Sequence, residues 1–209
     1  MKQLLQILVS RLFARLPKKF RGPVQIGLAA LVLAGLGVAS AYEGQAPESA
    51  GQHAEGHYQL QGRVVHVADG DTFTLMVGGR QEKIRMASID APETTKNRER
   101  PGQPMAQVSK DALAELVAGK TLALDCYEKD RYGRNVCDVP LADGTTANQR
   151  QVAAGMAWAN MEGRGKFMRD PRLPGLEQKA RQARLGLWRD ADPIKPWAWR
   201  YDCWQKGKC

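Results

Sequence analysis

Apolar and polar residues alternate from about residue 60 onward. Three successive runs place apolar residues at every second position: Val65 and Val67; Phe73, Leu75 and Val77; Ile84 and Met86. This period is typical of strands with one buried face. Gly78-Gly79, between the second and third runs, is a signal for a tight hairpin. We therefore expect three consecutive strands in this part of the chain.

A helical period follows a polar loop. We expect Pro104 to open a helix that ends at Gly119, with these residues on its apolar side: Met105, Ala112, Leu113, Leu116 and Val117. Strands at about 121–127 and 134–141 should form a second hairpin, followed by a short helix and by a last helix at about 172–185. This order predicts an α+β protein, built on a five-stranded β-barrel of the oligonucleotide/oligosaccharide-binding (OB) type with about three helices.

The N-terminus differs from the rest of the chain. Residues 1–42 hold six basic residues and no acidic one, and residues 24–42 form an apolar run. This is either a signal peptide cleaved near Ala41 or a membrane anchor, so the segment should contact the membrane at least transiently. In both cases residues 43 onward are exported to the periplasm or the extracellular space. The polar residues 43–58 should be a flexible linker, residues 59–188 the folded domain, and residues 189–209 a C-terminal extension.

The formal net charge is +9, but the N-terminal segment contributes most of it. The remainder holds 25 basic and 22 acidic residues, which makes a mildly basic domain. Between Arg164 and Arg200 there are ten basic and four acidic residues. That excess fits a polyanionic partner such as nucleic acid, although a solvated helix face would have the same composition.

The four cysteines fit an exported protein. Cys126 and Cys137 flank the turn of the second hairpin and would lie opposite each other at apolar positions of their strands. Opposite residues of an antiparallel pair lie within disulfide range. Cys203 and Cys209 could close a small loop. We expect two disulfides in an oxidising compartment; two buried thiols and a loose tail is the alternative.

Charged residues gather at the expected ends of the strands. They form three groups: Asp69 and Asp71; Arg85, Asp90 and Glu93; Asp130 to Arg134. Hydrolysis of a phosphodiester needs fixed cations around the phosphate oxygens, and a planar guanidinium binds two of them at once. Carboxylates can hold a divalent cation, and a further one can accept the proton of the attacking water. The three groups together therefore predict phosphodiester chemistry.

Three motifs carry a resemblance to a known family. They are DGDT at residues 69–72, R-x(4)-D-A-P-E from Arg85, and D-x-Y-G-R from Asp130. In this order, with a helix between the second and third, they resemble the staphylococcal nuclease (thermonuclease) family over about residues 60–188. The resemblance implies an OB-type barrel and a calcium-dependent endonuclease that cleaves DNA and/or RNA and leaves 3′-phosphate ends.

The resemblance also implies roles for individual residues. Asp71 and Asp90 would hold Ca²⁺ through their carboxylates, with the backbone carbonyl of Ala91 as a further ligand. Glu93 would position or deprotonate the attacking water. Arg85 and Arg134 would act in catalysis by binding the phosphate. Arg131 and Tyr132 would contact the substrate. Asp69 would belong to an outer shell at best, or shape the turn.

Two other function classes are compatible with an OB barrel. The first is a non-catalytic nucleic-acid-binding module of the cell envelope, and the second is an envelope protein that recognises anionic glycans. The nuclease is favoured by the presence of all five charged residues with an expected role at the metal or the phosphate: Asp71, Arg85, Asp90, Glu93 and Arg134. We expect the nuclease to act as a monomer.

Overall fold

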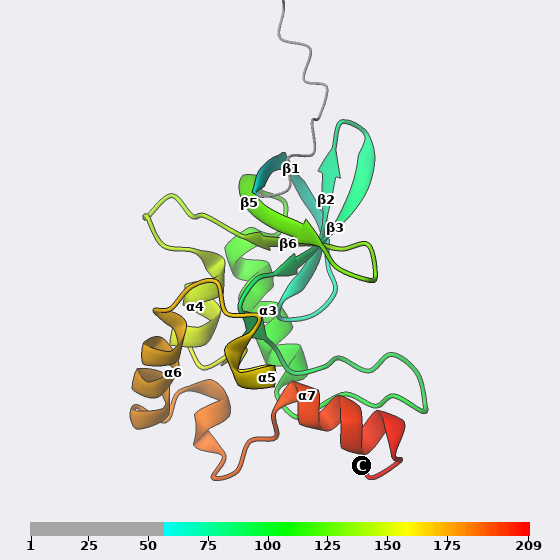
Figure 1. The fold of residues 1–209 in the computed structure, drawn as a ribbon, viewed down its shortest axis with the longest axis vertical. Coiled ribbons are helices and arrows are strands. Elements are labelled where there is room, and N and C mark those ends of the chain that lie inside the picture. The colour runs from blue at the N-terminus through cyan, green and yellow to red at the C-terminus, as the bar shows by residue number, and fades with distance from the viewer. Residues whose placement is uncertain (1–56) are drawn as a thin grey trace, which may run out of the picture. The chain divides into compact units, whose positions relative to one another are not determined.

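Within residues 57–209, the part of the chain described by the computed structural model, five strands close into a barrel (Figure 1). Their order around the barrel is β1-β2-β3-β6-β5. The bounds are Tyr58–Val67 for β1, Thr72–Val77 for β2, Arg80–Met86 for β3, Thr121–Lys129 for β5 and Asn135–Asp138 for β6. Neighbouring strands are antiparallel except β3 and β6, which pair in parallel. The predicted α+β architecture with an OB-type barrel is confirmed.

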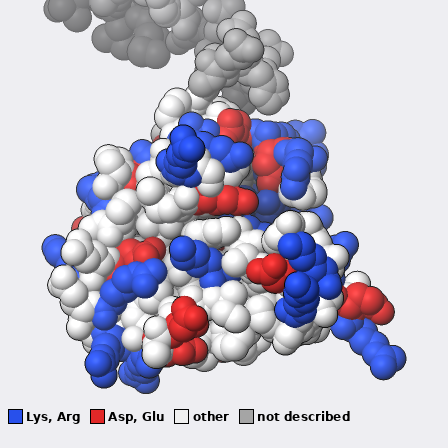
Figure 2. Space-filling model, turned by 60° about the horizontal axis from the view of Figure 1, so that its bottom comes forward, with Lys and Arg blue, Asp and Glu red and all other residues white. Residues whose placement is uncertain are grey.

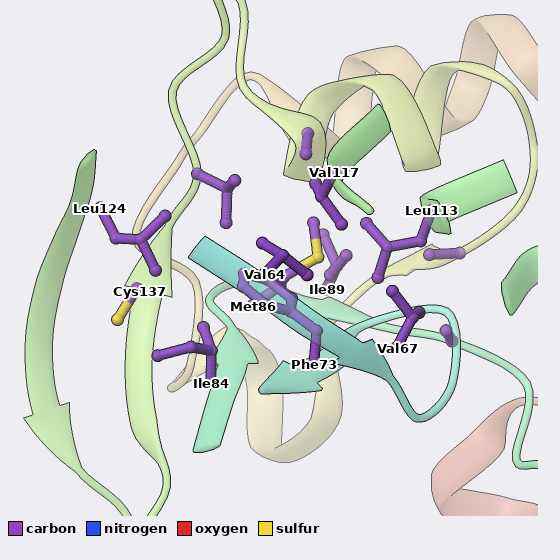
Figure 3. Close-up of a cluster of buried hydrophobic side chains, with 14 of the residues drawn as sticks. Val64, Val67, Phe73, Ile84, Met86, Ile89, Leu113, Val117, Leu124 and Cys137 are labelled. Atoms are coloured by element: carbon purple, nitrogen blue, oxygen red, sulfur yellow. The ribbon is translucent and has the colours of Figure 1, made fainter. Parts of the chain in front are cut away.

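The predicted alternation of apolar residues fills the barrel in β2 and β3 but is wrong for β1, where Val64 is buried and Val65 is exposed because the β1–β2 register shifts between Val64 and His66. Phe73 of β2 pairs with Ile84 of β3, and both are fully buried. Helix α3 (Ala106–Val117) contributes Leu113 and Val117 to the same core, which Figure 3 shows between the strands and the helix. Successive side chains of a strand point to opposite faces. Arg85 lies between the buried residues Ile84 and Met86, so it points to the other face of β3.

The predicted helices form with small shifts of their ends. α3 begins at Ala106 rather than at Pro104, because Met105 has the left-handed φ of 65° and cannot continue a helix. α4 (Ala147–Ala153) begins with a capping box in which Thr146 and Gln149 satisfy each other's backbone N–H groups. The last predicted helix, at about 172–185, forms as α6 (Leu173–Gln182), and a 3₁₀ turn, Gly186–Arg189, follows it.

Several short elements were not predicted. β4 (Ile89–Asp90) and β7 (Trp158–Ala159) pair with each other, and α5 spans Glu162–Gly165. The C-terminal extension forms α7 (Pro196–Trp199) and continues as a helical segment over Arg200–Gln205. Elements of two to six residues are too short to give a measurable period, so the sequence pattern could not indicate them.

Both predicted disulfides are present. Cys126 and Cys137 lie directly opposite each other in the β5–β6 pair, at the expected register, and are fully buried. Cys203 and Cys209, six positions apart, close a small loop at the C-terminus. The alternative of two buried thiols is therefore wrong.

The predicted signal peptide or anchor lies outside the described residues, and so does almost all of the predicted linker 43–58. β1 begins at Tyr58, one residue before the predicted start of the domain at residue 59. Among the described helices, none is long and apolar enough to cross a membrane.

Candidate active site

The turn between β1 and β2 presents Asp71. The carboxylate of Asp69 accepts a hydrogen bond of 3.2 Å from the Asp71 N–H, which closes the turn locally. Gly70 is required between them, since a Cβ here would collide with the side chain of Ser109. Gln151 fixes the same turn by donating to the Gly70 carbonyl at 2.8 Å. Asp69 and Gly70 thus shape the turn, and the side chain of Asp71 is left buried at its end.

Arg85 joins the two predicted metal-binding aspartates. Its Nη1 forms an ion pair with Asp71 Oδ1, and its Nη2 lies 2.7 Å from Asp90 Oδ1. The pairing of Arg85 with Thr72 across β2 and β3 places the guanidinium next to Asp71. The short strand β4 brings Asp90 to the same point, where its side chain is fully buried. One guanidinium therefore holds two carboxylates that are 19 positions apart in the sequence.

The charges of this group fix the protonation of its members. Burial raises the pKa of Asp71, but Arg85 and an N–H from Ala91 at 2.6 Å outweigh burial and hold that pKa below its usual value. Burial and the adjacent charge of Asp71 raise the pKa of Asp69 to about 7. Arg85 itself is largely removed from water, yet the two aspartates raise its pKa and keep it charged.

Glu93 lies beside this pair and meets two cations. Its Oε1 accepts a bond of 2.7 Å from Arg200, and its Oε2 is 3.9 Å from the Nζ of Lys96. Gln103 holds the backbone of Glu93 by accepting from its N–H and donating to its carbonyl. Burial raises the pKa of Glu93 despite the contact with Arg200. We use the name carboxylate cluster for Asp71, Asp90 and Glu93.

The structure does not bring every predicted residue into contact with the carboxylate cluster. Arg134 precedes β6 and pairs with Asp130 at 2.7 Å, and no contact joins it to the cluster in the described part of the chain. The parallel pairing of β6 with β3 nonetheless places it beside the strand that carries Arg85. Arg131 donates to the hydroxyl of Tyr132 at 2.7 Å, and Tyr132 is exposed, with two guanidiniums near its ring. These three residues form a separate exposed group at the tip of the hairpin.

The chemistry of the carboxylate cluster fits a hydrated divalent cation. Asp71 and Asp90 each place a carboxylate oxygen on the same guanidinium, and such oxygens are hard donors of the type Ca²⁺ prefers. In residues 57–209, no group of three or more His, Cys, Asp or Glu side chains has an arrangement that could hold a metal. A cation here would therefore take backbone oxygens and water for its remaining positions, which Ca²⁺ accepts.

On the face of the described residues seen in Figure 2, the basic side chains do not form a continuous track. Figure 2 shows basic side chains over much of one face, with acidic side chains among them. Some of the basic residues after residue 164 are engaged in ion pairs, for example Arg181 with Glu177 at 2.8 Å and Arg169 with Glu128 at 2.6 Å.

A family model described as staphylococcal nuclease homologue matches residues 83–190. An uncharacterized endonuclease of Escherichia coli O157:H7 is 42% identical over 142 residues, which cover 68% of this chain and 86% of that protein. The chain belongs to the staphylococcal nuclease family. A micrococcal nuclease of Shigella flexneri is 36% identical over 149 residues, covering 68% of this chain and 80% of that nuclease.

The sequence did not indicate Arg200, Lys96 or Gln103 as neighbours of the carboxylate cluster. Arg200 lies 107 residues after Glu93, outside the matched region, and no motif connects them. Lys96 is part of a polar loop whose path cannot be read from periodicity. A weak signal was available for Arg200, because it follows PWAW, an aromatic run that needs packing partners in the domain.

Proposed function

We propose that this member of the staphylococcal nuclease family is a Ca²⁺-dependent endonuclease that hydrolyses DNA and/or RNA and leaves 3′-phosphate ends. The observation that carries the proposal is the bridge formed by Arg85 between Asp71 and Asp90. A largely buried guanidinium between two buried carboxylates is costly to desolvate and is a common feature of functional sites. The names of the relatives, endonuclease and micrococcal nuclease, support the same activity.

Each residue of the site has a defined task in this proposal. A bound Ca²⁺ would polarise the phosphoryl oxygen and favour ionisation of the attacking water. Asp71 and Asp90, with the carbonyl of Ala91, would hold it. Glu93 would accept the proton of the water, a role that its raised pKa suits because it brings the carboxyl closer to the operating pH.

Arginine supplies the positive charge that the transition state requires. Arg85 is the predicted donor to the phosphate oxygens, since its planar group is fixed beside the carboxylates and needs little reorganisation. Arg134 would approach from the hairpin of β5 and β6 once the substrate replaces Asp130 as its partner. Arg131 and Tyr132 would contact the chain of the nucleic acid next to the scissile bond.

Purified full-length protein should therefore cleave single-stranded DNA in the presence of Ca²⁺ and stop when a chelator is added. The measurement is the shortening of an end-labelled oligonucleotide on a denaturing gel, together with a phosphatase test of the product ends. Binding without cleavage in both conditions would support the non-catalytic nucleic-acid-binding module. The glycan-binding alternative would be supported if anionic polysaccharide preferentially protected the protein and if Glu93→Ala left this protection unchanged.

The proposed enzyme acts outside the cytoplasm. Two disulfides in a chain of 209 residues are consistent with an oxidising compartment such as the periplasm or the extracellular space. The mass of the N-terminal peptide of the mature protein would show whether residues 24–42 are retained as an anchor.

A further inference from the structure

The C-terminal extension delivers a second guanidinium to the carboxylate cluster. The Nη2 of Arg200 lies 2.9 Å from Asp90 Oδ2, and its Nη1 lies 3.1 Å from Asp90 Oδ1. The same Nη1 donates to Glu93 Oε1 at 2.7 Å. Arg200 therefore uses both oxygens of one predicted cation ligand and one oxygen of the predicted base.

The segment that carries Arg200 is fixed to the loop that carries Glu93. The indole N–H groups of Trp199 and Trp204 both donate to the carbonyl of Pro101, at 3.0 and 2.8 Å. Gln103, which holds the backbone of Glu93, also donates to the Ile194 carbonyl at 2.9 Å. Figure 1 shows the resulting arrangement, with α7 and the following turns in red beside the green loop between β4 and α3.

We propose that Arg200 is a further residue of the active site, where its guanidinium competes with the divalent cation for Asp90 and Glu93 and lowers the affinity for that cation. This inference rests on the proposed function, because it takes Asp90 as a ligand of the cation. Asp90 Oδ1 accepts from both Arg85 and Arg200, and Oδ2 accepts from Arg200, so a cation that coordinates Asp90 has to share these oxygens with a guanidinium or displace it.

The balance of charge supports competition. Asp69 and Lys96 pair with each other at 3.3 Å and cancel in this balance. The three carboxylates of the cluster are opposed by two guanidiniums, Arg85 and Arg200, which leaves one negative charge. Without Arg200 the same group has two negative charges, which a divalent cation matches. The burial of Asp90 and the partial burial of Arg200 place this interaction in a medium where charges are weakly screened. The guanidinium of Arg200 therefore occupies part of the negative charge that a bound divalent cation would otherwise neutralise.

Isothermal titration of Ca²⁺ into the full-length protein and its Arg200→Ala variant tests this. The coupling between two interactions that affect one binding site is typically about 5–150-fold, so we expect the Kd of Ca²⁺ to fall by about tenfold in the variant. Arg200→Lys keeps the charge and should give an intermediate Kd. The matched control is Lys195→Ala, which removes an exposed cation of the same segment that lies against Trp197, and its Kd should equal that of the unmodified protein.

Further variants separate the possible results. Asp90→Asn identifies the cation site of the carboxylate cluster. Only Ca²⁺ binding that is lost in this variant is assigned to that site. If the Kd in Arg200→Ala equals the Kd of the unmodified protein, the competition by Arg200 is refuted while the cation site stands. If neither protein binds Ca²⁺ at a site that depends on Asp90, this inference and the proposed function both fail.

Trp204→Phe is a check that leaves every charge in place. It removes one of the two indole donors to Pro101 and should lower the Kd of Ca²⁺ by a smaller factor, because Arg200 is then held less firmly. A Kd that rises in Trp204→Phe, with a native circular dichroism spectrum, would contradict the proposal, because a less firmly held Arg200 should compete less.

Discussion

Arg85→Ala should lower the rate of Ca²⁺-dependent cleavage of single-stranded DNA by about 10²–10³-fold. This is the usual cost of removing one fixed donor to a charged transition state, and it corresponds to about 2.7–4 kcal/mol. The guanidinium is held by Asp71 and Asp90 beside the place that we propose for the phosphate. The measurement is the single-turnover cleavage rate at saturating protein, which separates chemistry from binding.

The same substitution leaves two buried aspartates without their shared partner, so a loss of stability must be separated from a loss of chemistry. Breaking a buried pair typically costs about 3–5 kcal/mol. Chemical denaturation should therefore accompany the kinetics, and rates should be compared only where both proteins are folded. Arg80→Ala is the matched control, because it removes an exposed arginine from the same strand. An Arg85→Ala variant that is folded and cleaves at the normal rate would contradict the assignment.

Glu93→Gln should reduce the cleavage rate by about 10²–10⁴-fold, the range that general acid–base groups contribute. The amide is nearly the same shape as the carboxylate and can still accept a hydrogen bond from Arg200, so the fold should change little. It cannot take a proton from water. The expected change is in the rate of the chemical step, with the affinity for the oligonucleotide preserved.

A control variant and two alternative outcomes decide how the result for Glu93→Gln is interpreted. Glu99→Gln, in the exposed part of the same loop, changes the charge by the same amount and should keep the normal rate. If Glu93 only positioned neighbouring side chains, Glu93→Gln would keep most of the activity. A variant with an unchanged rate would exclude Glu93 as the proton acceptor.

The sequence predicted the barrel well because the barrel is built by a simple rule. Alternate residues such as Phe73 and Ile84 face the interior, and that alternation is visible in the chain. Opposite placement of Cys126 and Cys137 follows from the same pairing rule. These features depend on local periodicity, which a single sequence contains.

The site was only partly predictable. Asp71, Arg85, Asp90 and Glu93 were indicated by motifs, and the structure brings them together. Arg200 was not indicated, because its place depends on how α7 packs on a loop about 100 residues earlier in the chain. The two-residue strand β4, which brings Asp90 to Arg85, is likewise set by its pairing with β7 rather than by its own residues.

The most direct test of the account is the position of a bound cation in crystals soaked with Ba²⁺ or a lanthanide. We predict an anomalous difference peak next to the carboxylates of Asp71 and Asp90, with the guanidinium of Arg200 moved away from Asp90. No peak beside these two aspartates, in crystals of protein that cleaves DNA in solution, would contradict the assignment of the site.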